Sequence, residues 1–113
     1  MTPRVRRGDI VGVAVSGDDG KPRPAVVVQT DAFPDNHQSV VVCQLTSELA
    51  SGPVWRVVVQ PGSGNGLRVA SEIMTDKPVT IRRERIGPAF GRLRPEEMKR
   101  LDAALAFVMG LGG

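Results

Sequence analysis

This sequence is poor in the residue types that hold metals and disulfides. Its 113 residues include one histidine, His37, and one cysteine, Cys43. One of each cannot build a zinc cluster, and a single cysteine cannot form an internal disulfide. Cys43 follows the apolar run 40–42, where a buried and unreactive thiol is expected. The sequence therefore predicts no metal site and no cofactor, and a reducing, cytoplasmic location suits the cysteine content.

Long apolar runs and aromatic residues are also scarce. No stretch approaches the roughly 20 apolar residues that a membrane-spanning helix needs, and the charged opening segment 1–9 is not followed by the apolar core of a signal peptide. There is no tyrosine, and the aromatic residues are one tryptophan and three phenylalanines, so a core must be built from aliphatic side chains. The length and the ordinary content of 41% hydrophobic residues predict a single domain spanning residues 1–113 that does not bind a membrane.

Positive charge is in slight excess, with a net charge of +3. It is concentrated in an opening and a late segment, and the residues concerned are Arg4, Arg6, Arg7, Arg82, Arg83, Arg85, Arg92, Arg94, Lys99 and Arg100. Clustered arginines favour a polyanionic partner, because a basic surface attracts nucleic acid. The alternative is a solvated basic face with no partner.

A series of short β-branched runs separated by turn residues fills most of the chain. Strands are predicted at residues 10–15, 24–30, 39–45, 54–60, 71–74, 79–81 and 89–93. Turns are predicted most clearly at 16–21 and 61–67, where glycine, aspartate and asparagine supply positive-φ positions. The residues 75–78 are expected to separate two of the strands, and Gly87-Pro88 is expected to end the charged segment 82–86 and to interrupt regular secondary structure. Short strands at regular spacing predict a small, mainly antiparallel β-barrel or curled sheet.

The hydrophobic period changes to that of a helix after the last predicted strand. Apolar residues recur at spacings of three and four, at Met98, Leu101, Leu105 and Val108. Pro95 fits the first helical position, the two glutamates after it suit the positive helix end, and Gly110 is a natural stop. Phe107 and Leu111 lie off the main apolar stripe, so they either pack against the strands or leave apolar surface for a dimer.

One arginine stands out because its backbone is stiffened on both sides. Pro22 and Pro24 fix φ near −65° around Arg23, at the start of the predicted strand 24–30. A guanidinium on such a firm base can present its planar donors to a phosphate. The alternative is an ordinary solvated loop arginine.

A hydroxyl residue is expected beside this arginine. If strands 24–30 and 39–45 pair as an antiparallel hairpin, the start of the first lies beside the end of the second, which places Arg23 next to Thr46. A cationic fork beside a hydroxyl can stabilise the charge of a pentacoordinate phosphorus. The same pair can also be a polar rim without chemistry. No phosphate-binding loop with its lysine is present, and His37 lies in a polar loop without a nucleophile elbow.

Five segments resemble the MazF/PemK family of toxin endoribonucleases. They are R-R-G-D-I-V at 6–11, K-P-R-P-A-V-V-V-Q at 21–29, V-V-V-C-Q-L-T-S at 40–47, N-G-L at 65–67 and L-D-A-A-L-A-F-V-M-G-L at 101–111. Their order and spacing match across nearly the whole chain. The resemblance implies a small SH3-like or CcdB-like antiparallel β-barrel with a C-terminal helix, working as a homodimer in the cytoplasm.

The resemblance also implies metal-independent, sequence-specific cleavage of single-stranded mRNA. In this reaction the ribose 2′-OH attacks the adjacent phosphate, leaving a 2′,3′-cyclic phosphate and a 5′-OH. Arg23 matches the arginine assigned to catalysis, and Thr46 matches the hydroxyl residue beside it. RNA-binding residues are predicted at Lys21, Ser47, Lys77, Arg82 and Arg83. The expected protein partner is a cognate antitoxin with a flexible acidic segment that folds on binding.

The late segment departs from the family pattern. Val79 stands where an arginine is common and Arg82 where an acid is common, so a second catalytic contribution from this segment stays open. The loop around Asp18 and Asp19 is shorter than in many relatives. Two other functions stay open at this point: a CcdB-like toxin that poisons DNA gyrase without enzymatic activity, and a nucleic-acid-binding barrel without catalysis.

Overall fold

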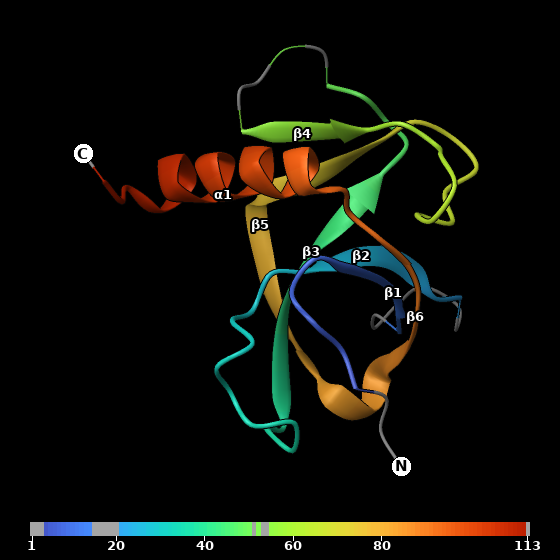
Figure 1. The fold of residues 1–113 in the computed structure, drawn as a ribbon, viewed down its shortest axis with the longest axis vertical. Coiled ribbons are helices and arrows are strands. Elements are labelled where there is room, and N and C mark those ends of the chain that lie inside the picture. Colours follow the sequence, from blue (N-terminus) through green and yellow to red (C-terminus); the bar gives the residue numbers. More distant parts are fainter. Residues whose placement is uncertain (1–3, 15–20, 51, 53–54, 113) are drawn as a thin grey trace.

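Six strands and one α-helix make up the computed structural model, which describes residues 4–14, 21–50, 52 and 55–112. The elements are β1 (Asp9–Val13), β2 (Arg23–Val27), β3 (Ser39–Thr46), β4 (Arg56–Val59), β5 (Ser71–Arg82), a short 3-10 turn η1 (Arg83–Arg85), β6 (Ile86–Arg92) and α1 (Pro95–Met109). The strands form one sheet in the order β4-β5-β3-β2-β1-β6, and all neighbouring strands are antiparallel. Helix α1 lies across the end of the sheet that carries β4 (Figure 1).

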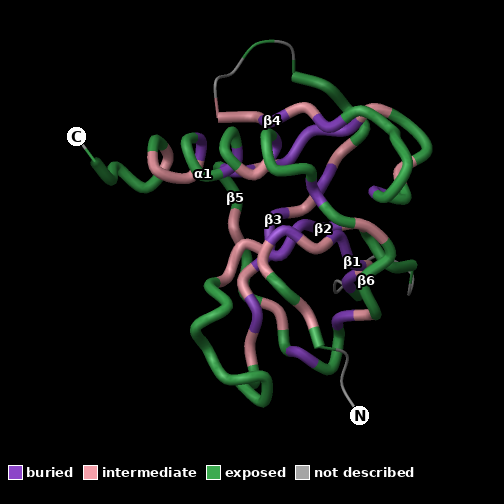
Figure 2. The backbone as a smooth tube through the Cα atoms, in the orientation of Figure 1, coloured by how far each residue is buried: buried purple, intermediate pink, exposed green. Residues whose placement is uncertain are grey.

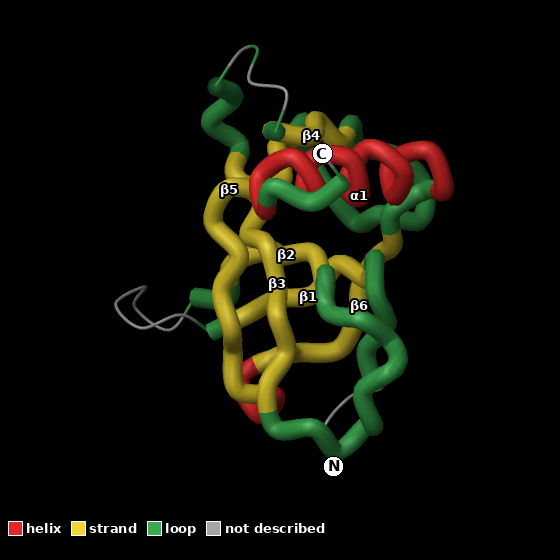
Figure 3. Tube along the Cα trace, turned by 90° about the vertical axis from the view of Figure 1, so that its left-hand side faces the viewer, coloured by secondary structure: helices red, strands yellow, loops and turns green. Residues whose placement is uncertain are grey.

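The sheet is curled like a barrel but stays open. Strands β4 and β6 are its two edges, and no hydrogen-bonded ladder joins them within the described residues. β4 pairs only with the first part of β5, from Ser71 to Met74, so it is too short to reach around to β6. The side view in Figure 3 shows the sheet bending between the α1 end and the opposite end. The predicted antiparallel, barrel-like β-fold with a C-terminal helix is confirmed, without full closure.

Strand β5 corrects one prediction. The sequence predicts two strands separated by residues 75–78, whereas β5 is a single strand of 12 residues. Its register against β3 shifts between Leu45, which is opposite Ile73, and Cys43, which is opposite Pro78. The expected loop is therefore a bulge, which lets the strand bend while it stays in the sheet.

The last strand corrects a second prediction. The sequence predicts an interruption of secondary structure at Gly87 and Pro88, but both residues lie inside β6. β6 is an edge strand, where a proline can sit without removing a ladder hydrogen bond on its open side. The remaining predicted strands agree with the structure to within a few residues. The turn predicted at 16–21, with its two aspartates, lies outside the described residues except for Lys21.

Two apolar clusters hold the sheet from its two faces. One, between the sheet and α1, contains Ile10, Val26, Cys43, Leu45, Val57, Val59, Ile73, Leu93, Leu101 and Ala104. The other, inside the curl, contains Val11, Val13, Ala25, Val27, Val40, Val42 and Ile86. Neighbouring residues fall into different clusters because side chains alternate along a strand. The central strands are thus buried on both faces (Figure 2), which explains their continuous β-branched sequences.

The single cysteine lies in the first of these clusters. Cys43 is fully buried, as expected. Burial, more than the nearby charge of Asp76, raises the pKa of its thiol to about 12. A thiol that stays protonated is a poor nucleophile. None of the described helices combines the length and apolarity needed to cross a membrane.

Helix α1 begins with a cap in which Arg94 donates two hydrogen bonds to Glu97. The backbone N–H of Arg94 donates to Oε1 of Glu97 at 2.8 Å, and the Arg94 guanidinium donates to Oε2 at 2.8 Å. Burial of the Glu97 carboxylate would raise its pKa, but these hydrogen bonds outweigh burial and lower the pKa instead. As predicted, Pro95 opens the helix, and Gly110 ends it with φ of 70°.

This cap predicts a pH-dependent contribution to stability. The pKa of Glu97 is lower in the folded protein than its ordinary value of 4.5. The ionised carboxylate therefore stabilises the fold above about pH 4.5, and this contribution is lost as the pH falls through the folded pKa. We expect Glu97→Gln to cost about 2 kcal/mol of unfolding free energy at neutral pH, measured by urea unfolding, and much less in acid. The exposed neighbour provides the control Glu96→Gln; equal losses for the two variants would contradict the expectation.

Candidate active site

A pocket of about 510 Å³ opens where several strand ends meet. Its lining comes from Gly12 in β1, from residues 22–24 at the start of β2, and from residues 44–48 at the end of β3. The opposite wall comes from residues 66–69 and from Phe90 in β6. The pocket therefore brings together segments that are far apart in the sequence.

The predicted pairing of the second and third strands is confirmed. Ala25 lies opposite Gln44, and Val26 lies opposite Cys43. Continuing this antiparallel register by two residues places Arg23 opposite Thr46. Both residues line the pocket. Their catalytic roles stay a prediction, but their proximity follows from the ladder.

The local hydrogen bonding of Thr46 leaves its hydroxyl able to donate a hydrogen bond to a ligand. Its Oγ1 accepts a hydrogen bond from the backbone N–H of Glu48 at 3.1 Å. A hydroxyl that accepts one hydrogen bond can still donate its own proton. Ser47, which was predicted to bind RNA, lines the pocket beside it. The end of β3 thus carries two hydroxyls at the pocket wall.

The turn that carries Arg23 packs closely on the neighbouring strand. A Cβ atom at Gly12 would lie 3.1 Å from Cβ of Pro22. The glycine therefore lets the proline-stiffened turn lie directly on β1. This contact adds tertiary support to the local rigidity that the sequence predicts for Arg23.

The charged lining favours an anionic ligand. Two arginines, Arg23 and Arg68, line the pocket together with one described carboxylate, that of Glu48. Across the part of the chain that the structure describes, no three histidine, cysteine, aspartate or glutamate side chains gather in a way that could hold a metal ion. The groups available for chemistry are guanidinium, hydroxyl and carboxylate.

The other predicted RNA-binding residues differ in their distance from the pocket. Lys21 is exposed and directly precedes the lining residue Pro22. Lys77 is exposed on the bulge of β5. Arg82 lies opposite Ser39, at the far end of the eight-residue strand β3 from Thr46, roughly 23 Å away along an extended strand. The structure does not bring Arg82 or its neighbour Arg83 to the pocket.

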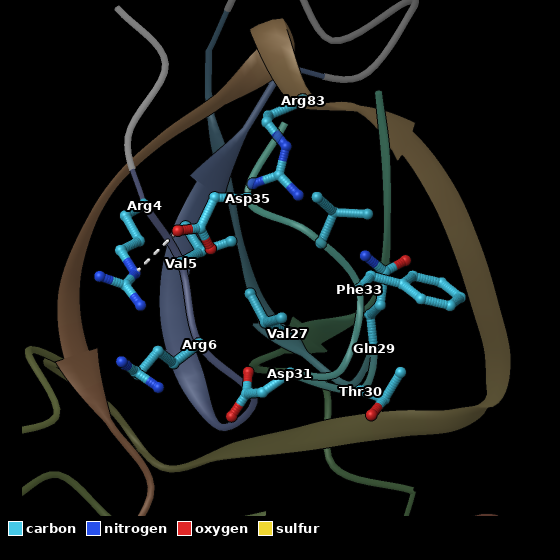
Figure 4. Close-up of a pocket in the computed structure, with 11 residues that line it drawn as sticks. Arg4, Val5, Arg6, Val27, Gln29, Thr30, Asp31, Phe33, Asp35 and Arg83 are labelled. Carbon is cyan, nitrogen blue, oxygen red and sulfur yellow. Dashed lines mark ion pairs between the residues drawn. The ribbon is translucent and has the colours of Figure 1, made fainter. Parts of the chain in front are cut away.

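Arg83 has a structural contact instead. Its side chain is buried, and its Nε donates to the backbone carbonyl of His37, while its backbone N–H donates to the carbonyl of Gln38 at 2.8 Å. The guanidinium points into a small polar hollow of about 40 Å³, beside the ion pair of Arg4 and Asp35 (Figure 4). RNA contact by Arg82 and Arg83 stays a prediction, and it would lie outside the pocket.

Much of the basic charge seen in the sequence is compensated within the chain. Ion pairs join Arg7 to Asp102 and Arg92 to Asp9, each at 2.6 Å, and Arg82 to Glu84 at 3.3 Å. Arg56 binds Asp76 at 2.9 Å, and its hydrogen bond is the main cause that lowers the pKa of this aspartate. The positive charge of these clusters is therefore partly neutralised by carboxylates of the same chain.

The lining residues that sequence reasoning missed include Glu48, Arg68 and Phe90. Glu48 follows the Thr46-Ser47 pair and could have been found from its place at the same strand end. Arg68 and Phe90 reach the pocket only through the fold, because they lie in a loop and in the edge strand β6. His37 is exposed and its ring lies 4.6 Å from that of Phe33, away from the pocket lining, in agreement with its expected surface position.

Comparison with known proteins identifies similar sequences. Residues 6–109 match the model of a family described as PemK-like, MazF-like toxins of type II toxin–antitoxin systems. A protein named probable endoribonuclease MazF, from Mycolicibacterium smegmatis, is 37% identical over 110 residues, covering 96% of this chain and 100% of that relative.

Solved structures share the fold at lower sequence identity. The Mycobacterium tuberculosis toxin MazF-mt6 has a TM-score of 0.79 at 22% identity, covering 93% of this chain and 99% of its own. A mycobacterial endoribonuclease in complex with its cognate antitoxin has a TM-score of 0.75 at 24% identity, covering 96% and 98%. A MazE–MazF structure from Deinococcus radiodurans has a TM-score of 0.76 at 18% identity, covering 99% of each chain.

Proposed function

Since this chain belongs to the family of PemK-like, MazF-like toxins of type II toxin–antitoxin systems, we propose that it is an endoribonuclease that cleaves single-stranded mRNA without a metal ion. The observation that carries the proposal is that Arg23 and Thr46, at adjoining ends of the paired strands β2 and β3, line one pocket. A guanidinium and a hydroxyl that line the same pocket can bind a phosphodiester and stabilise the charge of its transition state.

The proposed reaction is an internal transfer at phosphorus. The ribose 2′-oxygen forms a bond to the adjacent phosphorus, and the bond from phosphorus to the 5′-oxygen breaks. Arg23 stabilises the non-bridging oxygens through its fork, and the Thr46 hydroxyl donates to one of them. Glu48 is the described carboxylate of the lining, and in the proposed step it accepts the proton of the 2′-OH. The leaving 5′-oxygen takes up a proton from water, and Glu48 later returns its proton to the solvent, so that the products are a 2′,3′-cyclic phosphate and a 5′-OH.

The proposed partners are an antitoxin and a second copy of the chain, in the cytoplasm. The relatives include an endoribonuclease in complex with its cognate antitoxin, and a flexible acidic segment would complement Arg23 and Arg68. For the dimer, the last turn of α1 and the residues after it carry exposed apolar side chains, with Phe107 61% and Leu111 67% exposed. The Phe107 ring stacks on that of Trp55, with centroids 6.0 Å apart, which extends this apolar surface.

The test is incubation of the purified protein with a long single-stranded RNA in EDTA, followed by analysis of the new ends. We expect cleavage to cyclic phosphate and 5′-OH ends by a protein that sediments as a dimer at micromolar concentration. Products with 3′-OH ends would exclude attack by the 2′-OH. Binding without cleavage would indicate a non-catalytic module, and intact RNA together with inhibited gyrase would indicate the CcdB-like function. The 37% identical relative named an endoribonuclease favours the first outcome.

A further inference from the structure

An aromatic ring lies exposed in the wall of the pocket. Phe90 is 48% exposed and lines the same pocket as Arg23 and Thr46. Exposing a phenyl ring forgoes the favourable burial of its apolar surface, about 25 cal/mol for each Å². This phenylalanine comes from the edge strand β6, whereas the two proposed catalytic residues come from β2 and β3. It therefore forms a wall that is separate from the catalytic pair.

One side of the Phe90 ring is packed against a glycine. A Cβ atom at Gly66 would lie 2.5 Å from Cδ1 of Phe90, so any side chain there would collide with the ring. Gly66 also has φ of 69°, a conformation that glycine adopts without strain. The backbone at Gly66 thus supports the ring on one side, while the exposed part of the ring belongs to the pocket.

The loop that supports Phe90 is itself held firmly. Asn65 is buried, and its Oδ1 accepts hydrogen bonds from the backbone N–H groups of Gly62 at 3.2 Å and Leu67 at 3.0 Å. Its Nδ2 donates to the carbonyl of Gln60 at 2.8 Å. The backbone N–H of Arg92 in β6 donates to the carbonyl of Gly64 at 2.8 Å. These bonds fix the loop on β6 and make the Phe90 wall rigid before any ligand binds.

The Phe90 wall lies about two strand spacings from the proposed catalytic arginine. Val13 of β1 pairs with Arg23 of β2, and Val11 of β1 pairs with Ala89, the neighbour of Phe90 in β6. Adjacent strands are about 4.8 Å apart, and two residues along β1 add roughly 7 Å, so the backbones at Arg23 and Ala89 are roughly 12 Å apart. This separation suits a base on a nucleotide next to the phosphate that Arg23 binds.

We propose that Phe90 is a specificity-determining residue that stacks one nucleobase of the RNA, next to the scissile phosphate. The proposal rests on the proposed function and adds the place where one base is held. Single-stranded RNA is bound in this way because its bases can splay out and stack on an exposed aromatic ring. Arg68 lies in the lining beside Gly66, and within the described residues its side chain has no hydrogen bond or ion pair. Its guanidinium is available to donate to acceptor atoms on the edge of the stacked base.

The experiment compares Phe90→Leu and Phe90→Trp with the wild-type protein on short RNAs that contain one cleavage site. A series of RNAs carries an abasic residue at successive positions beside the site. At the position that Phe90 reads, we expect Phe90→Leu to lower kcat/KM by about 10-fold on the normal RNA and to have no further effect on the abasic RNA. Phe90→Trp is expected to retain activity. The matched control is Phe33→Leu, an equally exposed phenylalanine (45%) that is remote from the lining and is expected to change nothing.

Several outcomes would overturn the stacking proposal. They are an unchanged kcat/KM in Phe90→Leu, an equal loss on the normal RNA and on every abasic RNA, and a loss accompanied by dissociation of the dimer, which would make Phe90 an interface residue. A binding measurement separates this proposal from the proposed function. For an RNA that carries 2-aminopurine at the same position, binding of the wild-type protein should quench the 2-aminopurine fluorescence, whereas binding of Phe90→Leu should not. Quenching without any cleavage would support the stacking site and contradict the endoribonuclease.

Discussion

Replacing Arg23 with alanine is expected to lower the rate of RNA cleavage by about 10²- to 10³-fold, the usual cost of removing one preorganised donor from a charged transition state. Arg23 is held between two prolines, pairs with Val13 of β1 and packs on that strand through Pro22, so the position of its backbone is set before substrate binds. The measurement is the single-turnover rate at saturating RNA in EDTA. Because Arg23 is exposed, the variant should unfold at the same urea concentration as the wild-type protein.

Two further variants show whether the cleavage rate depends on the planar guanidinium of Arg23, on its charge alone, or on its place in the fold. Arg23→Lys keeps the charge but loses the planar fork, so we expect only partial activity. Arg82→Ala removes another exposed arginine, which lies in β5 opposite the start of β3, and should leave the single-turnover rate nearly unchanged. If Arg82→Ala lost more activity than Arg23→Ala, the active site would lie at the η1 end of the sheet, and the proposed pocket would be wrong.

Gly91→Ala is expected to cost about 3 kcal/mol of unfolding free energy, at the upper end of the usual range for overpacking. A Cβ atom at position 91 would lie 2.1 Å from the carbonyl oxygen of Asn65 and 2.3 Å from its carbonyl carbon. These are main-chain atoms, so no side-chain rotation can relieve the clash. The loop 61–67 must move away from β6, which breaks the hydrogen bond between Arg92 and Gly64. Urea unfolding at neutral pH measures the loss.

The control for this prediction is Gly87→Ala, a glycine in the same strand. A Cβ atom there would meet the carbonyl oxygen of Gly12 at 3.6 Å, an ordinary contact. We expect a change of less than about 1 kcal/mol, since volume can be added where space is open. Similar losses for the two variants would mean that strand β6 disfavours alanine in general, and that the loop contact is not the cause.

The local elements of this fold could be predicted because their causes are local. The β-branched runs predict strands, and the proline at position 95 with the glycine at position 110 predicts both ends of α1. The proximity of Arg23 and Thr46 could also be predicted, since two consecutive strands that pair as a hairpin place the start of the first beside the end of the second. These inferences need only the order of residues and the geometry of a strand pair.

Other features could not be predicted, because they depend on how all the strands of the sheet are arranged. The sequence around Pro78 suggests a loop, yet β5 continues because β4 covers only its first part and leaves the proline without a partner strand on that side. RNA binding by Arg82 and Arg83 stays a prediction, but the sequence does not show how far these arginines lie from the pocket. The length of β3 separates Arg82 from Thr46, and the burial of Arg83 assigns it to the loop that carries His37.

By itself, the sequence determined the strand-rich fold, the closing helix and the pairing of the two strands that carry Arg23 and Thr46, because propensity, capping and hairpin register act over short distances along the chain. Only the tertiary structure decided that the sheet stays open, that β5 bends instead of breaking, and that Phe90 and Arg68 complete the pocket. Those features depend on contacts between distant segments, such as the loop of Asn65 lying on Gly91, and no local pattern encodes such an approach.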